Sequence, residues 1–226
     1  MARTDLAQKN AEIRSKSLHA AARLFLERGY TAATMRDIAS EAGVNVSAMI
    51  RAVGNKETIM CELVHYVLEG QFQATTRLLD GVTEDKILFY ATETTLQLYM
   101  AESDEHIREI YAAAYSLPES SALIMRIIAG KLEDIFGAYQ PNLESKDFYE
   151  LEIASGGIIR GYMTIPCDMY FTMERKVRRF LEASLRIYQV PEEKIQEAVA
   201  FVSRFDYSAI AQGAVESMLS ALEQGI

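Results

Sequence analysis

Apolar residues recur along this chain with the period of an α-helix, and no stretch alternates with the period of a strand for long enough to make a sheet. Near the N-terminus, Leu18, Ala21, Ala22 and Phe25 fall on one helical face. Gly29 follows them, and a glycine in the left-handed conformation commonly ends a helix. The periodicity predicts an all-α chain from its first segment onward.

After residue 80 the sequence reads as long helices with few breakers. Proline removes a backbone donor and restrains the residue before it, so each proline marks an expected helix boundary. The four prolines all stand where helical patterns stop: Pro118, Pro141, Pro166 and Pro191. No low-complexity linker separates the first segments from the rest, so the fourth helix is expected to join them directly.

Residues 34–53 are predicted to form two short helices joined by the turn Gly43-Val44-Asn45. Thr34 and Asp37 have the spacing of a capping box, and Asn45 is a suitable cap for the second helix. That helix has an apolar stripe, and Asn55 is expected to cap a longer helix that starts at Lys56; the stripe is Val46, Met49, Ile50 and Val53. Two short helices at a steep angle allow the second to enter a DNA major groove about 12 Å wide.

The charge is distributed unevenly along the chain. The net charge of −9 is unusual for a nucleic-acid binder, but residues 1–60 hold nine Lys and Arg against six Asp and Glu, a net of +3. The remaining residues hold 14 basic and 26 acidic side chains. A basic head on an acidic body indicates two functions in one chain, although a surplus of three charges does not establish DNA binding.

Four short segments in the first 60 residues resemble the signature of the tetracycline-repressor (TetR) family. They are Ala21-Ala22-x-Leu24-Phe25-x-Glu27-x-Gly29-Tyr30, Thr34-x-x-Asp37-Ile38-Ala39, Ala42-Gly43-Val44 and Asn55-Lys56-Glu57. The resemblance implies an N-terminal three-helix domain with a helix-turn-helix over residues 1–56. It also implies a helical bundle over residues 57–226 that binds an effector and dimerises. The expected function is a ligand-responsive transcriptional regulator, a repressor, released from palindromic operator DNA by a small, largely apolar molecule.

The resemblance implies DNA contacts from the helix-turn-helix and the helix start after it. The candidate residues are Thr34, Arg36, Asn45, Val46, Ser47, Ile50, Arg51 and Lys56. Thr34 and Lys56 correspond to phosphate contacts at helix N-termini, which favour anions. The alternative is that Thr34 and Asn45 only cap helices and that Lys56 and Arg51 are solvated charges.

Ile50 departs from the family pattern, which usually has a tyrosine that contacts a DNA phosphate at this place. One interpretation is that Ile50 faces DNA without that hydrogen bond. The other is that it lies on the buried side with Val46, Met49 and Val53. The departure keeps an alternative function open, a TetR-like helical ligand-binding or interaction protein with weakened DNA reading.

Residues 86–163 are rich in Tyr, Met and Phe, the side chains that commonly line small-molecule pockets. Candidate ligand contacts are Tyr90, Tyr99, Tyr111, Tyr115, Met125, Phe136, Tyr139 and Tyr162. Aromatic residues at helical spacing are also ordinary core, and the pocket itself is implied only by the resemblance. Ser155-Gly156-Gly157 and Gly161 predict the close approach of another helix or a ligand.

Two late apolar stripes are candidates for dimerisation, because comparable helices of the family pair across a two-fold axis. The first is Val177, Phe180, Leu181, Ser184, Leu185 and Tyr188, and the second is Ile195, Ala198, Val199 and Val202. The alternative is that both stripes pack within the monomer.

Other functional classes lack sequence support. Cys61 and Cys167 match no zinc or redox spacing, and His19, His65 and His106 share no ligand spacing. No nucleophile elbow or phosphate-binding loop occurs, so no catalytic residue, metal or cofactor is expected. An enzyme or carrier built on an all-helical body would need a carboxylate or histidine with a shifted pKa inside its pocket, and no motif indicates one. No run of 18 apolar residues or secretory signal is visible, which favours a cytoplasmic protein without a membrane partner.

Overall fold

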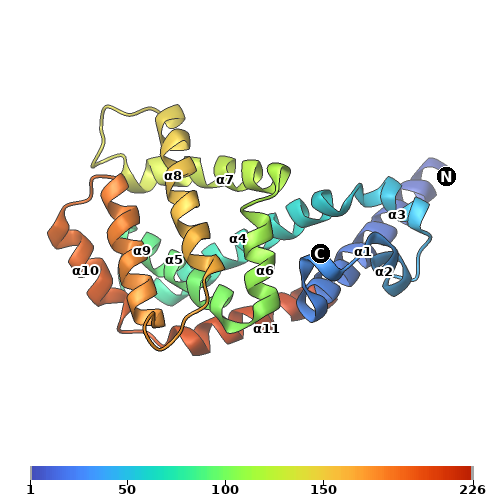
Figure 1. The fold of residues 1–226 in the computed structure, drawn as a ribbon. Helices are drawn as coiled ribbons and strands as arrows, with labels where there is room; N and C mark the ends of the chain where they lie inside the picture. The colour runs from blue at the N-terminus through green and yellow to red at the C-terminus, as the bar shows by residue number, and fades with distance from the viewer. Residues whose placement is uncertain (1, 225–226) are drawn as a thin grey trace.

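The computed structural model describes residues 2–224, and side chains within them at 7–217 and 220. In that part of the chain all regular secondary structure is helical, which confirms the all-α prediction (Figure 1). The helices are α1 Ala2–Ala32, α2 Met35–Glu41, α3 Val46–Val53, α4 Lys56–Leu79, α5 Lys86–Ser103, α6 Glu105–Ala114, α7 Pro118–Phe136, α8 Ser145–Thr164, α9 Met173–Ile187, α10 Glu192–Val202 and α11 Tyr207–Gln224. None of them is long and apolar enough to cross a membrane.

Side-chain caps set the limits of α2, α3 and α4, as predicted. The Asp37 amide donates to Thr34 Oγ1 at 3.2 Å, and the Thr34 amide donates to Asp37 Oδ2 at 3.0 Å, which completes the capping box. Asn45 Oδ1 accepts from the Ser47 amide at 2.9 Å. Asn55 Oδ1 accepts from the Thr58 amide, also at 2.9 Å. Each cap satisfies a helix N-terminus that would otherwise leave donors unpaired.

Gly29 interrupts the first helix, as predicted. Gly29 has φ 78° and ψ 162°, so α1 bends there and continues for a further short turn to Ala32. A Cβ at Gly29 would overlap the Glu109 carboxylate of α6, so the missing side chain also permits a close contact between these helices. The amide of Thr31 donates to Glu109 Oε1 at 2.7 Å. This contact stabilises the extra turn, and sequence pattern alone did not reveal it.

The head formed by α1, α2 and α3 shares its core with α4. Phe25, Ile38 and Met49 are buried together with Ile59 and Leu63 of α4, and the cluster extends to residues of α6 and α7. Figure 1 shows α4 running from the head into the body. The expectation that no linker separates the two parts is therefore confirmed.

Helix α5 is the centre of the body. It contacts α4, α6, α7, α8, α9, α10 and α11, and nearly all of its side chains are buried. The body core includes Phe136 and Tyr188, whose rings stack in parallel with centroids 4.0 Å apart. The prolines lie at helix boundaries as predicted: Pro118 begins α7, Pro141 follows α7, Pro166 follows α8, and Pro191 caps α10.

Both stripes proposed for dimerisation are instead buried within the monomer. On α9 and its C-terminal cap the buried residues include Phe180, Leu181, Leu185 and Tyr188. On α10 they are Ile195, Ala198, Val199 and Val202. The prediction was wrong for these residues because the stripes pack on the body's own helices. Helix α9 packs mainly on α8 and α10, and α10 packs on α9 and α5, which leaves little of either stripe for a second subunit.

The glycines of α8 behave in two different ways. At Gly156 a Cβ would lie 3.1 Å from Glu152 Oε1 and 4.0 Å from a ring carbon of Tyr115, so close approach explains this residue. Gly157 and Gly161 are exposed, and a Cβ on either would meet no described atom within 4 Å. For these two glycines the predicted close approach is wrong within the single chain.

Candidate functional site

The outward face of α3 carries exposed side chains from its first and last turns. Ser47, Ile50 and Arg51 are exposed, whereas Met49 and Val53 are buried in the head core. Ile50 is 48% exposed, so it does not belong to the buried stripe, and that part of the prediction is wrong. Val46 is half-buried at the edge of this face. The geometry matches the interpretation in which Ile50 points away from the core.

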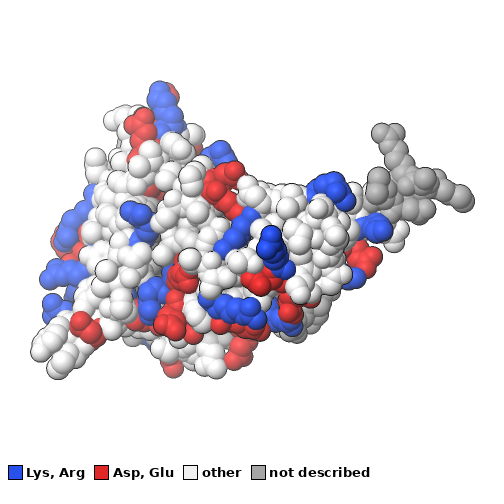
Figure 2. Space-filling model, turned by 45° about the vertical axis from the view of Figure 1, so that its right-hand side comes forward, with Lys and Arg blue, Asp and Glu red and all other residues white. Residues whose placement is uncertain are grey.

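Two arginines of the head are available on its surface. Arg36 and Arg51 are exposed, and neither takes part in an ion pair within the part of the chain that the structure describes. Arg14 and Arg23 are instead paired with Glu62 and with Glu41, respectively. Figure 2 shows Lys and Arg interspersed with Asp and Glu rather than gathered in a region of one sign. On the face that Figure 2 shows, charges of both signs are therefore mixed.

Lys56 is held against α1. Its Nζ lies 4.1 Å from the centroid of the Tyr30 ring and 3.4 Å from the Thr31 carbonyl oxygen. Burial lowers the pKa of the Lys56 ammonium. A cation over an aromatic face is an attractive contact, so this side chain helps to fasten α4 to the end of α1. Its role as a phosphate contact stays a prediction, as do the DNA roles of Thr34 and Asn45, whose side chains cap helices.

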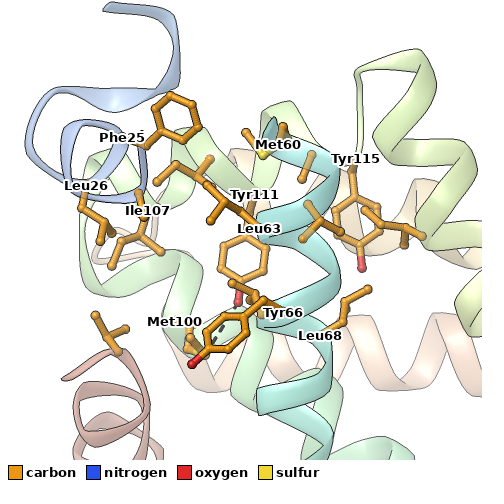
Figure 3. Close-up of a pocket in the computed structure, with 17 residues that line it drawn as sticks. Phe25, Leu26, Met60, Leu63, Tyr66, Leu68, Met100, Ile107, Tyr111 and Tyr115 are labelled. Atoms are coloured by element: carbon orange, nitrogen blue, oxygen red, sulfur yellow. Dashed lines mark hydrogen bonds between the residues drawn. The ribbon is translucent and has the colours of Figure 1, made fainter. Parts of the chain in front are cut away.

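An apolar cavity of about 110 Å³ lies where the head meets the body (Figure 3). Phe25 and Leu26 reach it from α1, and Ile107 and Tyr111 reach it from α6. Side chains of α4 form a further wall, chiefly Met60, Leu63, Tyr66 and Leu68. Residues of the head and of the body therefore enclose the same space.

A second, smaller cavity of about 30 Å³ lies deeper in the body and is polar on one side. Its polar wall consists of Tyr90, Glu93, Thr94, Gln97, Tyr115, Lys131, Glu152 and Ser155. Gln97 Nε2 donates to Glu93 Oε1 at 2.6 Å, and the Tyr115 hydroxyl donates to Gln97 Oε1 at 3.2 Å. Ser155 Oγ donates to Glu152 Oε2 at 2.6 Å. Tyr115 lines both cavities.

Two carboxyl groups in the polar cavity bind protons unusually tightly. Burial raises the pKa of Glu93 to about 7, opposed by the Gln97 hydrogen bond and the charge of Lys131. Burial likewise raises the pKa of Glu152 to about 7, and the negative charge of Glu93 adds to the effect. Both groups are thus near the balance point between neutral and charged forms at neutral pH, which makes them sensitive to any ligand charge.

The predicted ligand residues are spread over several places. Tyr90 and Tyr115 line the polar cavity, and Tyr111 and Tyr115 line the apolar one. Tyr99 lies in an outer groove and stacks on Tyr207. The others line neither cavity: Phe136 is buried in the core, Tyr162 packs beside Phe171 and Phe180, and Met125 and Tyr139 are half-buried. Their ligand roles stay predictions.

Sequence reasoning missed Phe25, Leu26 and the α4 residues of the apolar cavity, because it looked for ligand contacts only after residue 86. It also missed Glu93 and Glu152. A signal for Glu93 was present, since the segment Ile87–Met100 is apolar or uncharged apart from this residue. A helical segment with a single charge is expected to be largely buried, so the one carboxylate within Ile87–Met100 is expected to be buried with it.

Helix α6 connects the two parts of the molecule by direct hydrogen bonds to α1. His106 Nδ1 lies 2.9 Å from the Leu26 carbonyl oxygen, and Glu109 accepts from the Thr31 amide. On the other side, Glu57 of α4 accepts from the Glu119 amide at the start of α7, at 2.6 Å. Two hydrogen bonds therefore join α6 directly to α1, and one joins α4 to α7.

Comparisons with known proteins agree with this architecture. A family model for bacterial regulatory proteins of the tetR family matches residues 18–63. No curated protein sequence matches the chain significantly. The fold is similar to that of RolR in complex with the ligand resorcinol, with a TM-score of 0.66 and 15% identity over 88% of this chain and 97% of that chain. An ArpA-like gamma-butyrolactone receptor gives a TM-score of 0.44 and 21% identity over 91% of this chain and 99% of that chain. The N-terminal region of this chain, residues 18–63, is thus similar to the bacterial regulatory proteins of the tetR family.

Proposed function

We propose that this protein is a ligand-responsive repressor that binds palindromic operator DNA as a dimer and is released by a small effector with a largely apolar body. The observation that carries the proposal is the apolar cavity, because Phe25 and Leu26 of the DNA-reading head form part of its wall. RolR, whose fold is similar, was solved with a small aromatic ligand, resorcinol. An effector of comparable size is proposed for this chain.

The proposed release mechanism follows from the volume of the apolar cavity. Its 110 Å³ is less than the roughly 150 Å³ of a cavity that accommodates benzene. An aromatic effector would therefore have to enlarge the cavity and separate α1 from α4 and α6. Such a ligand lowers DNA affinity only if it binds the DNA-free shape more tightly than the DNA-bound shape. Separation of α1 would change the spacing of the two reading heads in the dimer.

We place the dimer interface on the outer face of α8 and the loop that follows it, in place of the buried stripes. This surface holds most of the exposed large apolar side chains of the described chain: Tyr149, Ile153, Ile165, Met169 and Tyr170. Gly157 and Gly161 lie on the same exposed side of α8 and let a second backbone approach closely. Tyr149, Ile153, Gly157, Gly161 and Ile165 recur every four residues and so share one side of the helix, and exposed apolar residues gathered in this way are typical of interaction surfaces.

Selection from random DNA duplexes tests the DNA-binding part of the proposal. We expect enrichment of a near-palindrome whose half-sites are about 34–36 Å apart or somewhat more. Arg51→Ala should relax base preference in one position of each half-site and lower affinity by about 1–3 kcal/mol per contact. Arg178→Ala, an exposed arginine of α9, is the matched control and should change neither. Failure to enrich any motif would favour the alternative, a TetR-like interaction protein that reads DNA weakly.

Ile50→Tyr is expected to tighten binding to specific and nonspecific DNA by a similar factor. A phenol at this outward position would add one phosphate hydrogen bond per subunit, worth roughly 1.5–3 kcal/mol, or about tenfold or more in affinity. The melting temperature should not change, because the side chain is exposed. Ile50→Phe supplies the ring without the hydroxyl and should leave DNA affinity near that of the wild type. Equal gains from Tyr and Phe in fluorescence titrations would rule out the hydrogen bond as the cause.

A further inference from the structure

The polar cavity contains a carboxylate oxygen without a partner. Glu93 is only 4% exposed, and its Oε1 accepts from Gln97. Its Oε2 has no hydrogen-bond partner among the described residues, and the side chain lines the cavity. A buried acceptor without a donor costs free energy, so such groups call for an explanation. A ligand group that donates hydrogen bonds at this place would satisfy it.

A second carboxyl faces the same space. Glu152 of α8 is 5% exposed and lines the cavity beside Ser155. Gly156 leaves the space next to Glu152 Oε1 open, because any Cβ there would press on that oxygen. The two acidic groups come from helices α5 and α8, and the negative charge of Glu93 contributes to the raised pKa of Glu152. The site therefore brings together two buried carboxyl groups from different helices.

The charges around this space are unbalanced. The titratable groups that face it are Glu93 and Tyr90 of α5, Tyr115 at the end of α6, Lys131 of α7, Glu152 of α8 and, through Ser155, Tyr188 at the end of α9. Lys131 is the only cation among the lining residues, and its Nζ lies over the Phe72 ring at 4.0 Å, on the exposed side. When both carboxyls are ionised, the interior holds an excess of negative charge next to aromatic faces, which attract cations.

We propose that the polar cavity binds the primary ammonium group of an amine ligand, with Glu93 and Glu152 as its carboxylate partners. This inference rests on the proposed function, because it identifies the effector of that function as an amine. The cavity volume limits the size of the charged group that can enter, since about 30 Å³ holds one or two water-sized groups. A primary ammonium has that size and three donors, whereas a trimethylammonium group is too large.

The remainder of the ligand belongs in the apolar cavity. Tyr115 lines both spaces, so an aryl group among Phe25, Met60 and Leu63 and an ammonium beside Glu93 would be connected by a short chain that passes this ring. Phe72 and Lys131 line both the polar cavity and an outer groove between α4 and α7, which makes this pair the shortest route for entry. An arylalkylamine thus matches both compartments.

Ammonium binding is expected to release protons. A cation favours the ionised forms of Glu93 and Glu152, so a carboxyl that holds a proton in the free protein passes it to solvent on binding, and no covalent bond changes. Because burial raises both pKa values to about 7, affinity should increase as the pH rises from about 6 to 8. An alkylammonium has a pKa near that of lysine, so the ligand keeps its charge throughout this range.

Titration calorimetry on the DNA-free protein tests the site. The probes are phenylalkylamines with one to four methylenes, the matching alcohols, and the trimethylammonium form of the best amine. We expect at least one amine to bind ten times more tightly than its alcohol, and the trimethylammonium form to bind at least ten times more weakly than its amine. Glu93→Gln and Glu152→Gln should each weaken amine binding at least tenfold and leave alcohol binding unchanged. Glu150→Gln, on the exposed side of α8, is the matched control and should bind as the wild type does.

Three results would overturn the proposal: no amine that binds better than its alcohol, unchanged amine affinity in both glutamine variants, or a trimethylammonium form that binds as well as the amine. If a glutamine variant does not fold, the pH dependence of the wild type decides, and an affinity that stays flat from about pH 6 to 8 overturns the site. DNA affinity is measured separately. Amines that bind as expected but leave operator affinity unchanged would refute the coupling in the proposed function and not the ammonium site.

Discussion

Leu181→Asp is expected to unfold the protein rather than to release a folded monomer. Leu181 is fully buried in the body core. Removing a buried leucine side chain costs about 2–5 kcal/mol, and an aspartate adds the cost of burying a carboxyl without a partner. Domains of this kind are stable by only about 5–15 kcal/mol, so the combined loss removes most or all of the stability.

Thermal unfolding followed by circular dichroism measures this effect. We expect Leu181→Asp to be insoluble or to lose its cooperative transition. Arg178→Asp, one turn away on the exposed side of the same helix, should keep the wild-type transition within a few degrees. A folded, monomeric Leu181→Asp protein would contradict the structure and would restore the α9 stripe as a subunit interface.

Ile153→Asp is expected to produce a folded monomer that has lost most of its operator affinity. Ile153 is 51% exposed on the outer face of α8, so the substitution leaves the core intact but places a charge in the proposed interface. A dimer binds two half-sites with the second contact made intramolecular, which raises affinity by about 10²–10⁴. Loss of the dimer should therefore weaken operator binding by at least a hundredfold.

Sedimentation velocity at micromolar concentration gives the oligomeric state, and titration with the selected operator gives the affinity. Val82→Asp makes the same kind of change at a 49% exposed apolar residue of the α4–α5 connection and should remain dimeric. If Ile153→Asp is dimeric, the interface does not use α8. If the wild type is monomeric, the proposed mode of operator binding is wrong.

Local sequence signals were sufficient for the helix-turn-helix. Thr34, Asp37, Asn45 and Asn55 form caps with residues two or three positions away, so their function depends on sequence spacing alone. The prolines marked helix boundaries for a similar reason, because the lost donor is a property of one residue. The all-α class followed from periodicity, which is likewise local.

Which side of a helix is buried, and against which partner, was harder to predict from the sequence. The stripes of α9 and α10 were correctly recognised as apolar, but a stripe that packs on α5 and a stripe that packs on a second subunit look identical in sequence. Ile50 shares a helical stripe with Met49 and Val53, yet it points outward, because the position of α1 decides which arc of a short helix is covered. Only the arrangement of neighbouring helices distinguishes these cases.

The sequence by itself determined the helical class, the caps and turn of the head, and the resemblance of that head to the tetR family. The tertiary structure alone decided that Phe25 of the head and Tyr111 of the body enclose one cavity, and that Glu93 and Glu152 meet in another. The reason is physical. Caps and periodicity arise from interactions within a few residues, whereas a cavity and the burial that shifts a pKa arise from residues far apart in the chain that packing brings together.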